Sequence, residues 1–195
     1  MKLYFILVWL LFEGMGARAQ DQKEERFVET LNAIIHGFSS LDSVAVNKFV
    51  HQENGLYLID RVGVYNHINH FKKVTFKNLK YPLVLFSNAK SIKISKPFFQ
   101  ALPVWDCTRG WSKWGVYADT TQTDHFVSHF CKTDNKLEPG RYTLNTIHFF
   151  HKLETASRRI VAADKSGKEL VFYLSFVEGQ WYLTILDFAS TDCSV

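Results

Sequence analysis

The sequence contains few residues that interrupt or cross-link a chain: four prolines, ten glycines and three cysteines among 195 residues. It also lacks internal repeats, low-complexity tracts and any linker long enough to separate two domains. Three of the prolines, Pro82, Pro97 and Pro103, exclude a long element from the middle of the chain. A length of this order is expected for one domain.

Several chemical signatures are missing as well. There is no Gly-x-Ser-x-Gly, no phosphate-cradling glycine loop and no cysteine in a recognised protease setting. Nucleophilic catalysis therefore has no support. No basic run exceeds two residues, and without residues 1–19 the chain carries 21 basic and 18 acidic residues, a net charge of +3. That charge is too small and too evenly spread to indicate a nucleic-acid partner.

The long hydrophobic run that a membrane span would need is also absent. Lys2 is followed by an unbroken apolar run of ten residues, Leu3 to Phe12, and then by Ala17-Arg18-Ala19. A positive start, a short apolar run and small residues at the cleavage positions are typical of a secretory signal peptide. Residues 1–19 are predicted to be cleaved. The mature domain, residues 20–195, would then be secreted or periplasmic, with no integral membrane segment.

Three cysteines remain in the predicted mature chain, and export permits one disulfide among them. Cys131 lies in a segment that reads as a short helix, one turn after Val127, so a buried thiol is plausible there. Cys107 and Cys193 each follow an aspartate in irregular segments, which favours a Cys107–Cys193 bond. Cys107–Cys131 is the main alternative.

The apolar pattern predicts helices first and an antiparallel meander last. Phe27, Leu31, Ile34 and Phe38 recur at helical spacing. The expected helices are 21–38, 42–50, 124–132 and 144–155, with a helical turn at 65–72. The expected strands are 55–64, 114–119, 158–163, 169–177 and 181–188, with short strands around 82–87 and 91–95. This order indicates an α+β architecture.

The last two strands allow a register to be predicted. A two-residue Gly179-Gln180 loop would fit a primed hairpin turn. It would pair Phe172 with Asp187 and place Asp187 on the same face as Leu183 and Ile185. Both faces of the hairpin would be largely apolar. One would pack under the N-terminal helices, and the other would need a cover or line a cavity.

The final meander, Phe-Tyr-Leu-Ser-Phe-Val-Glu-Gly-Gln-Trp-Tyr-Leu-Thr-Ile-Leu-Asp, resembles nuclear-transport-factor-2-like proteins, as do the helix pair and the bent early strand. The ending from Trp181 to Cys193 resembles uncharacterised exported bacterial members. The resemblance implies N-terminal helices packed in a curved, mainly antiparallel sheet, which forms a cone with a pocket. Members include isomerases, dehydratases, hydrolases and non-catalytic binding modules, and many dimerise through the sheet, so a homodimer is one option. The fold alone does not select among these activities.

Polar residues near the expected pocket are the candidates for chemistry. Asp187, on an apolar strand face, would be desolvated and could act as a general acid or base, with Tyr173 or His67 as its polarising partner. The structural interpretation is that it caps a backbone amide or meets an arginine. Asp60 could form a second polar pair with Arg61, or belong to the turn before Gly63.

Eight histidines raise the question of a metal. Pairs lie four apart at His125 and His129, and three apart at His67 and His70 and at His148 and His151. A zinc site needs three or four converging ligands, and the His-Glu-x-x-His motif is absent because Phe126 occupies the glutamate position. Neither a metal nor a cofactor is predicted.

Aromatic residues gather around Cys107: Trp105, Trp111, Trp114 and Tyr117. With interspersed charges they could form a surface that stacks on a sugar or another ring, or they could form a wall of the core. Asp60, His67, Trp114, Tyr117 and Tyr173 are the candidate ligand-binding residues.

These features favour a non-catalytic exported module that binds a small apolar or aromatic ligand or a partner protein. The alternative is a small-pocket isomerase or hydrolase that uses Asp187 as its base. A third option is a protein-interaction surface without a pocket, which a cavity filled by Phe side chains would indicate.

Overall fold

The structure is a computed structural model that describes residues 2–77, 79, 97–119, 125–165 and 169–193; for residues 2–19 and Val62 only the backbone is described. Within these residues the fold is α+β, with four helices and a mixed six-stranded sheet. The predicted strands at 82–87 and 91–95 lie outside the described residues.

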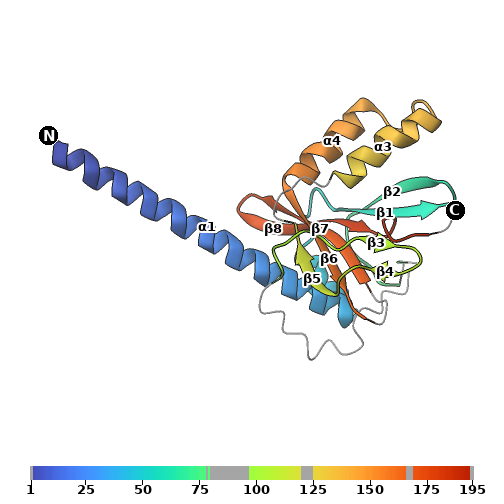
Figure 1. The fold of residues 1–195 in the computed structure, drawn as a ribbon, viewed down its shortest axis with the longest axis horizontal. Coiled ribbons are helices and arrows are strands. Elements are labelled where there is room, and N and C mark those ends of the chain that lie inside the picture. Colours follow the sequence, from blue (N-terminus) through green and yellow to red (C-terminus); the bar gives the residue numbers. More distant parts are fainter. Residues whose placement is uncertain (1, 78, 80–96, 120–124, 166–168, 194–195) are drawn as a thin grey trace.

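Helix α1 (Lys2–Ser39) has two parts with different surroundings. Its N-terminal part runs out from the body of the molecule, and its C-terminal part lies against the sheet (Figure 1). Phe27, Leu31, Ile34 and Phe38 are fully buried there, at the helical spacing seen in the sequence. They share one hydrophobic cluster with sheet residues such as Phe172 and Leu183. The short helix α2 (Ser43–Asn47) follows, capped by Asp42, whose carboxylate accepts from the Ala45 amide at 2.9 Å.

The six strands occur in the order β2-β1-β8-β7-β6-β5. Their bounds are β1 Leu56–Val62, β2 Tyr65–Phe71, β5 Gly115–Ala118, β6 Ser157–Ala163, β7 Glu169–Val177 and β8 Gln180–Asp187. The β1–β8 pairing is parallel, and the other four pairings are antiparallel. Because β1 pairs with β8, the first and last strands of the chain lie side by side in the sheet.

The hairpin between β7 and β8 differs from the predicted register. Val177 pairs with Gln180, so the loop is Glu178-Gly179, with φ values of +50° and +82°. Two positive φ values suit a primed turn, and glycine adopts that conformation without strain. Leu174 pairs with Leu183 but Tyr173 pairs with Ile185, so Thr184 is an extra residue in β8. Beyond this bulge every β8 side chain changes face.

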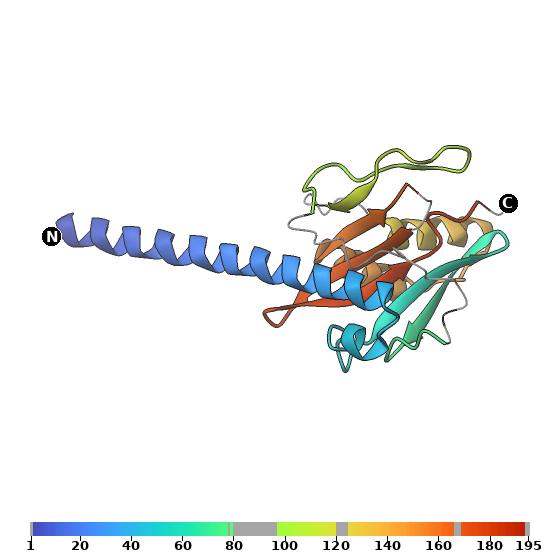
Figure 2. The ribbon, with the colours of Figure 1, turned by 90° about the horizontal axis from the view of Figure 1, so that it is seen from below.

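The opposite face of the sheet is covered by two further layers. Helices α3 (Phe126–Leu137) and α4 (Leu144–Thr155) lie on the side away from α1 (Figures 1 and 2). Their buried residues, including Val127 and Phe150, pack against Tyr173 and Ile185. The small ribbon of β3 (Trp105–Asp106) and β4 (Gly110–Trp111) covers the β6–β7 part of this face, where Trp111 packs on Val161 and Val171.

One predicted element is wrong. Residues 65–72, expected as a helical turn, form strand β2, which returns from the turn at Gly63 and pairs along its whole length with β1. The helix predicted at 144–155 is confirmed as α4, with Thr143 as its cap. The helix predicted at 124–132 extends to Leu137 as α3.

Candidate functional site

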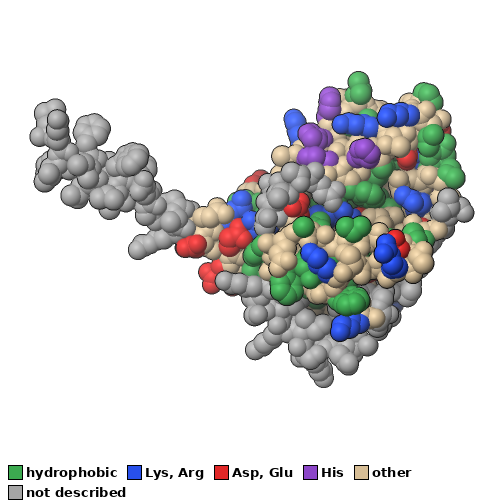
Figure 3. Space-filling view, viewed as in Figure 1, with side chains coloured by type: hydrophobic (Ala, Val, Ile, Leu, Met, Phe, Trp, Pro, Cys, Tyr) green, Lys and Arg blue, Asp and Glu red, His purple; other side chains and the backbone are tan. Residues whose placement is uncertain are grey.

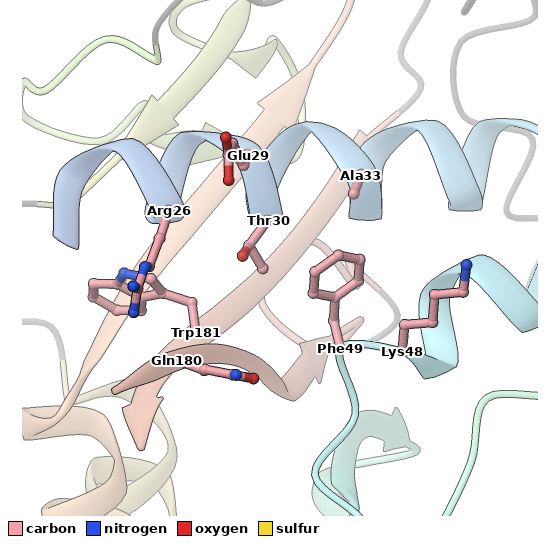
Figure 4. Close-up of a pocket in the computed structure, with 8 residues that line it drawn as sticks. All are labelled: Arg26, Glu29, Thr30, Ala33, Lys48, Phe49, Gln180 and Trp181. Atoms are coloured by element: carbon pink, nitrogen blue, oxygen red, sulfur yellow. The ribbon is translucent and has the colours of Figure 1, made fainter. Parts of the chain in front are cut away.

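The structure has a partly open groove between α1 and the start of β8, with a volume of about 470 Å³. Helix α1 supplies Arg26, Glu29, Thr30 and Ala33. The facing wall consists of Lys48 and Phe49, from the segment after α2, and Gln180 and Trp181, from β8 (Figure 4).

The α1 wall is one stripe of the helix. Positions 26, 29, 30 and 33 follow the spacing that places side chains on one face, and they span roughly 10 Å along the axis. Neighbouring positions such as Phe27 and Leu31 point into the core. One helix therefore seals the sheet with its apolar face and lines the groove with the adjacent face.

Trp181, in the wall that faces α1, is held in place by several contacts. The Trp181 indole N–H donates to the Lys23 carbonyl at 3.0 Å, and its ring meets Phe27 edge-on at 5.0 Å between centroids. At one end, the Arg26 guanidinium donates to the Gly179 carbonyl at 3.0 Å, which ties α1 to the β7–β8 turn. A rigid wall favours binding because few side chains lose conformational entropy when a ligand binds.

The groove combines apolar and charged groups. Phe49 supplies apolar surface beside the buried Trp181, and Thr30 points from α1 into the space between them (Figure 4). Arg26 and Lys48 bring two positive charges, and Glu29 is the one acid in the lining. This arrangement suits a ligand with an apolar body and a negative group.

A second groove, of about 380 Å³, adjoins the first at Lys48. Its lining includes His51, Glu53 and Glu178, so it is more polar and contains more acidic groups than the first. Together the two grooves follow the segment between α2 and β1.

Asp187 is buried but faces neither groove. Its carboxylate accepts from Arg159 at 2.9 Å and from the amides of Ala189 and Ser190 at 3.1 and 2.9 Å. The predicted pairing of Asp187 with Phe172 is wrong: Phe172 pairs with Leu186, and the bulge places Asp187 on the α3 side of the sheet. These contacts match the structural interpretation, in which the carboxylate caps backbone amides and meets an arginine.

The other predicted site residues are distributed over separate places. Asp60 lies opposite His67 across the β1–β2 pair and accepts from Asn69. Tyr173 is buried between the sheet and α3–α4. Trp114 is half exposed, and its carbonyl accepts from the hydroxyl of Tyr117 at 3.4 Å. None of these residues lines the two grooves.

The aromatic segment around Cys107 divides into core and surface. The rings of Trp105 and Trp111 meet edge to face, with their centroids 5.3 Å apart. Trp111 is buried against the sheet, and its indole N–H donates to the Glu169 carboxylate. Burial raises the pKa of Glu169 above its usual value. These two tryptophans form a wall of the core, whereas Trp114 remains on the surface.

The disulfide is Cys107–Cys193, the pairing that the sequence favoured. It ties the C-terminal tail to the β3–β4 ribbon across 86 residues of chain. Cys131 is a free, fully buried thiol, and burial raises its pKa to about 12.

Among the described residues, no group of three or more His, Cys, Asp or Glu side chains could hold a metal ion. Histidines do gather on the α3–α4 layer (Figure 3), where the rings of His125 and His151 lie 4.5 Å apart. Close by, Glu154 of α4 accepts from the amides of Val127 and Ser128 and thereby caps α3. Burial raises the pKa of Glu154.

The groove residues were not predicted as a site. The available signal was the mixed polar stripe Arg26, Glu29, Thr30 and Ala33 beside the apolar stripe of the same helix. The facing wall could not be read in this way, because Phe49 and Trp181 lie 132 positions apart and meet only once β8 pairs with β1.

Comparison of the chain with protein-family models, curated proteins and solved structures gives no match. Within the residues whose side chains are described, no helix is long and apolar enough to cross a membrane. Functional inference therefore depends on the geometry of the chain itself.

Proposed function

We propose that this protein is a non-catalytic binding module that holds a small amphipathic anion, with an aromatic or aliphatic body, in the groove between α1 and β8. The observation that carries the proposal is the apolar surface of Phe49, beside the buried Trp181, in a groove that also contains the positive groups of Arg26 and Lys48. Such a site would orient a ligand by its charge and retain it by its apolar body.

The filled interior supports a site at the edge of the fold. Phe27, Phe38 and Phe172 are fully buried between α1 and the sheet and fill the space between them. By the same reasoning a partner protein that inserts an acidic or aromatic side chain into the groove is the second candidate.

We also propose that the chain is a nuclear-transport-factor-2-like domain and that it is exported. The α1 helix against a sheet with four antiparallel pairings supports a nuclear-transport-factor-2-like domain. The Cys107–Cys193 disulfide supports export. Cleavage after Ala19 would remove the part of α1 that runs out from the body and would leave Phe27 to Phe38 in place (Figure 1).

The catalytic alternative has less support. It needs Asp187 beside a cavity, but both carboxylate oxygens are engaged by Arg159 and by two backbone amides. A general base must be within reach of the proton it abstracts.

The experiment uses two fluorescent probes of similar shape. Anilinonaphthalene sulfonate is an anion, and phenylnaphthylamine is its neutral counterpart. We expect both to bind, and Ala33→Trp, which fills the groove, to abolish binding of both. Arg26→Gln with Lys48→Gln should weaken binding of the anion at least roughly tenfold, since a hydrogen bond to a charged group contributes about 1.5–3 kcal/mol, and should leave binding of the neutral probe nearly unchanged.

Val64→Trp is the matched control, because Val64 is exposed at the β1–β2 turn. Native mass spectrometry of the protein from an exported fraction would then identify any natural small ligand. Equal binding of the probes to the wild type and to Ala33→Trp would refute the proposal. An acidic peptide that binds while both probes fail would favour the protein partner.

A further inference from the structure

A second surface of the chain, separate from the groove, combines exposed apolar side chains with lysines. Its apolar members are Phe98, Val104 and Trp114, which expose 49%, 69% and 52% of their surface. Lys113 and Lys165 lie among them and are exposed. We call this set the aromatic–lysine face. Figure 3 shows hydrophobic and basic side chains mixed over the region of β3, β4 and β5.

Contacts between these residues make the face continuous. Phe98 pairs with Tyr117 of β5, and their rings lie 5.1 Å apart. The Lys113 ammonium lies 5.7 Å from the Tyr117 ring, and the Lys165 ammonium lies 5.4 Å from the Trp114 ring. Val104 joins through its backbone, which exchanges hydrogen bonds with Ser112 at 2.9 Å in both directions.

The described residues of the face carry more positive than negative charge. Within residues 97–118 the one acid is Asp106, which is bound to Arg109, and Asp164 is the acid next to Lys165 in the chain. The ammonium groups of Lys113 and Lys165 lie beside aromatic rings, so the positive charges and the rings are close together at the surface.

The shape distinguishes this face from a small-molecule site. Its apolar side chains project individually, and neither of the two grooves includes any of them. In Figure 2 the segment 97–118 lies on one side of α1. Helix α2, which borders the groove, lies on the other side of α1. A small ligand would need a concave site.

We propose that the aromatic–lysine face docks this protein on an anionic lipid surface. Tryptophan and phenylalanine rings insert at the boundary between headgroups and acyl chains, and lysines bind the lipid phosphates. The disulfide anchors the tail to the ribbon that carries Val104, which keeps the face rigid. The face acts independently of the groove.

The test is co-sedimentation with vesicles, using protein from an exported fraction whose N-terminus is determined by mass spectrometry. We expect binding to vesicles of phosphatidylcholine with phosphatidylglycerol, weaker binding to phosphatidylcholine alone, and loss of binding at high salt. Lys113→Glu with Lys165→Glu should lower the partition coefficient at least roughly thirtyfold, since each lysine near such a surface contributes about fivefold.

The matched control is Lys132→Glu with Lys152→Glu, which reverses two exposed lysines on α3 and α4. It makes the same change in net charge and should keep most of the binding. Brominated lipids should quench tryptophan fluorescence in the wild type, and this quenching should be lost in Trp114→Phe, a change that preserves packing.

Three results would overturn the proposal. The first is equal loss of binding in the two double variants, which would reduce the effect to net charge. The second is no difference between the two vesicle compositions. The third is a wild-type dimer in light scattering that Trp114→Ala converts to a monomer, since the face would then join two copies of the chain. Failure of the probes in the groove would leave all of these outcomes unchanged.

Discussion

Replacing Leu31 with alanine tests whether α1 is part of the folded core. Leu31 is fully buried in the cluster that α1 shares with the sheet. Alanine is at least as good a helix former as leucine, so the substitution removes packing without weakening the helix. Any loss of stability therefore reports contact between α1 and the sheet.

The expected loss is about 3 kcal/mol, within the 2–5 kcal/mol typical of buried Leu→Ala changes. For a domain of this length that corresponds to a fall in melting temperature of roughly 6–12 °C. Denaturant unfolding followed by circular dichroism would give the free energy, and an unchanged slope would show that the unfolded state is the same.

Leu144→Ala provides the matched control, because Leu144 is 72% exposed at the start of α4. It should change stability by no more than about 0.5 kcal/mol. A loss below about 1 kcal/mol for Leu31→Ala would refute the reasoning. The helix would then not be packed on the sheet, and the groove would lose one wall.

Three further predictions concern the cysteines and one ion pair. Cys107→Ser should lower the free energy of unfolding by about 2–5 kcal/mol, and reductant should lower that of the wild type by the same amount; a wild type that is insensitive to reductant would contradict this. Cys131, with its pKa of about 12, should not react with a thiol reagent at pH 8 until the chain is unfolded, when one thiol should titrate. Hydrogen bonds and charge from Arg158 lower the pKa of Glu24 below 4.5, so the pair stabilises the fold above that pH and the contribution fades as pH falls through the folded-state value. Glu24→Gln should remove this part of the dependence of the free energy of unfolding on pH. If the wild type and Glu24→Gln lose stability in the same way as the pH falls, the pair has no effect.

Helices were predictable where their apolar stripe is complete. Phe27 to Phe38 and the segment 144–155 carry a period of three to four that only a helix buries on one side. The β2 segment carried no such pattern, because it is the edge strand and its residues after Ile68 are exposed. Its extended form follows from pairing with β1, which is a tertiary effect that local sequence does not encode.

The groove was hidden for a related reason. Its α1 wall follows from helix periodicity, but its other wall depends on the parallel pairing of β1 with β8. That pairing joins residues about 130 positions apart, as between Tyr57 and Ile185. Sequence patterns identify which face of an element is apolar, and they do not identify which two elements meet.

The Thr184 bulge connects the error in register to the change in the proposed site. Thr184, Ser175 and Ser157 are buried on three adjacent strands, and their hydroxyls form a chain with two oxygen–oxygen distances of 2.6 Å. The chain satisfies the polar groups of the extra residue, so the bulge does not leave a buried hydroxyl unpaired. Beyond it Asp187 turns to Arg159 on the α3 side, where the pair closes a structural network. A regular hairpin would have placed that carboxylate beneath α1, among the aromatic residues that fill the interior. The one extra residue thus moves the most attractive catalytic candidate out of that position and leaves the edge groove as the site with accessible charge and apolar surface together.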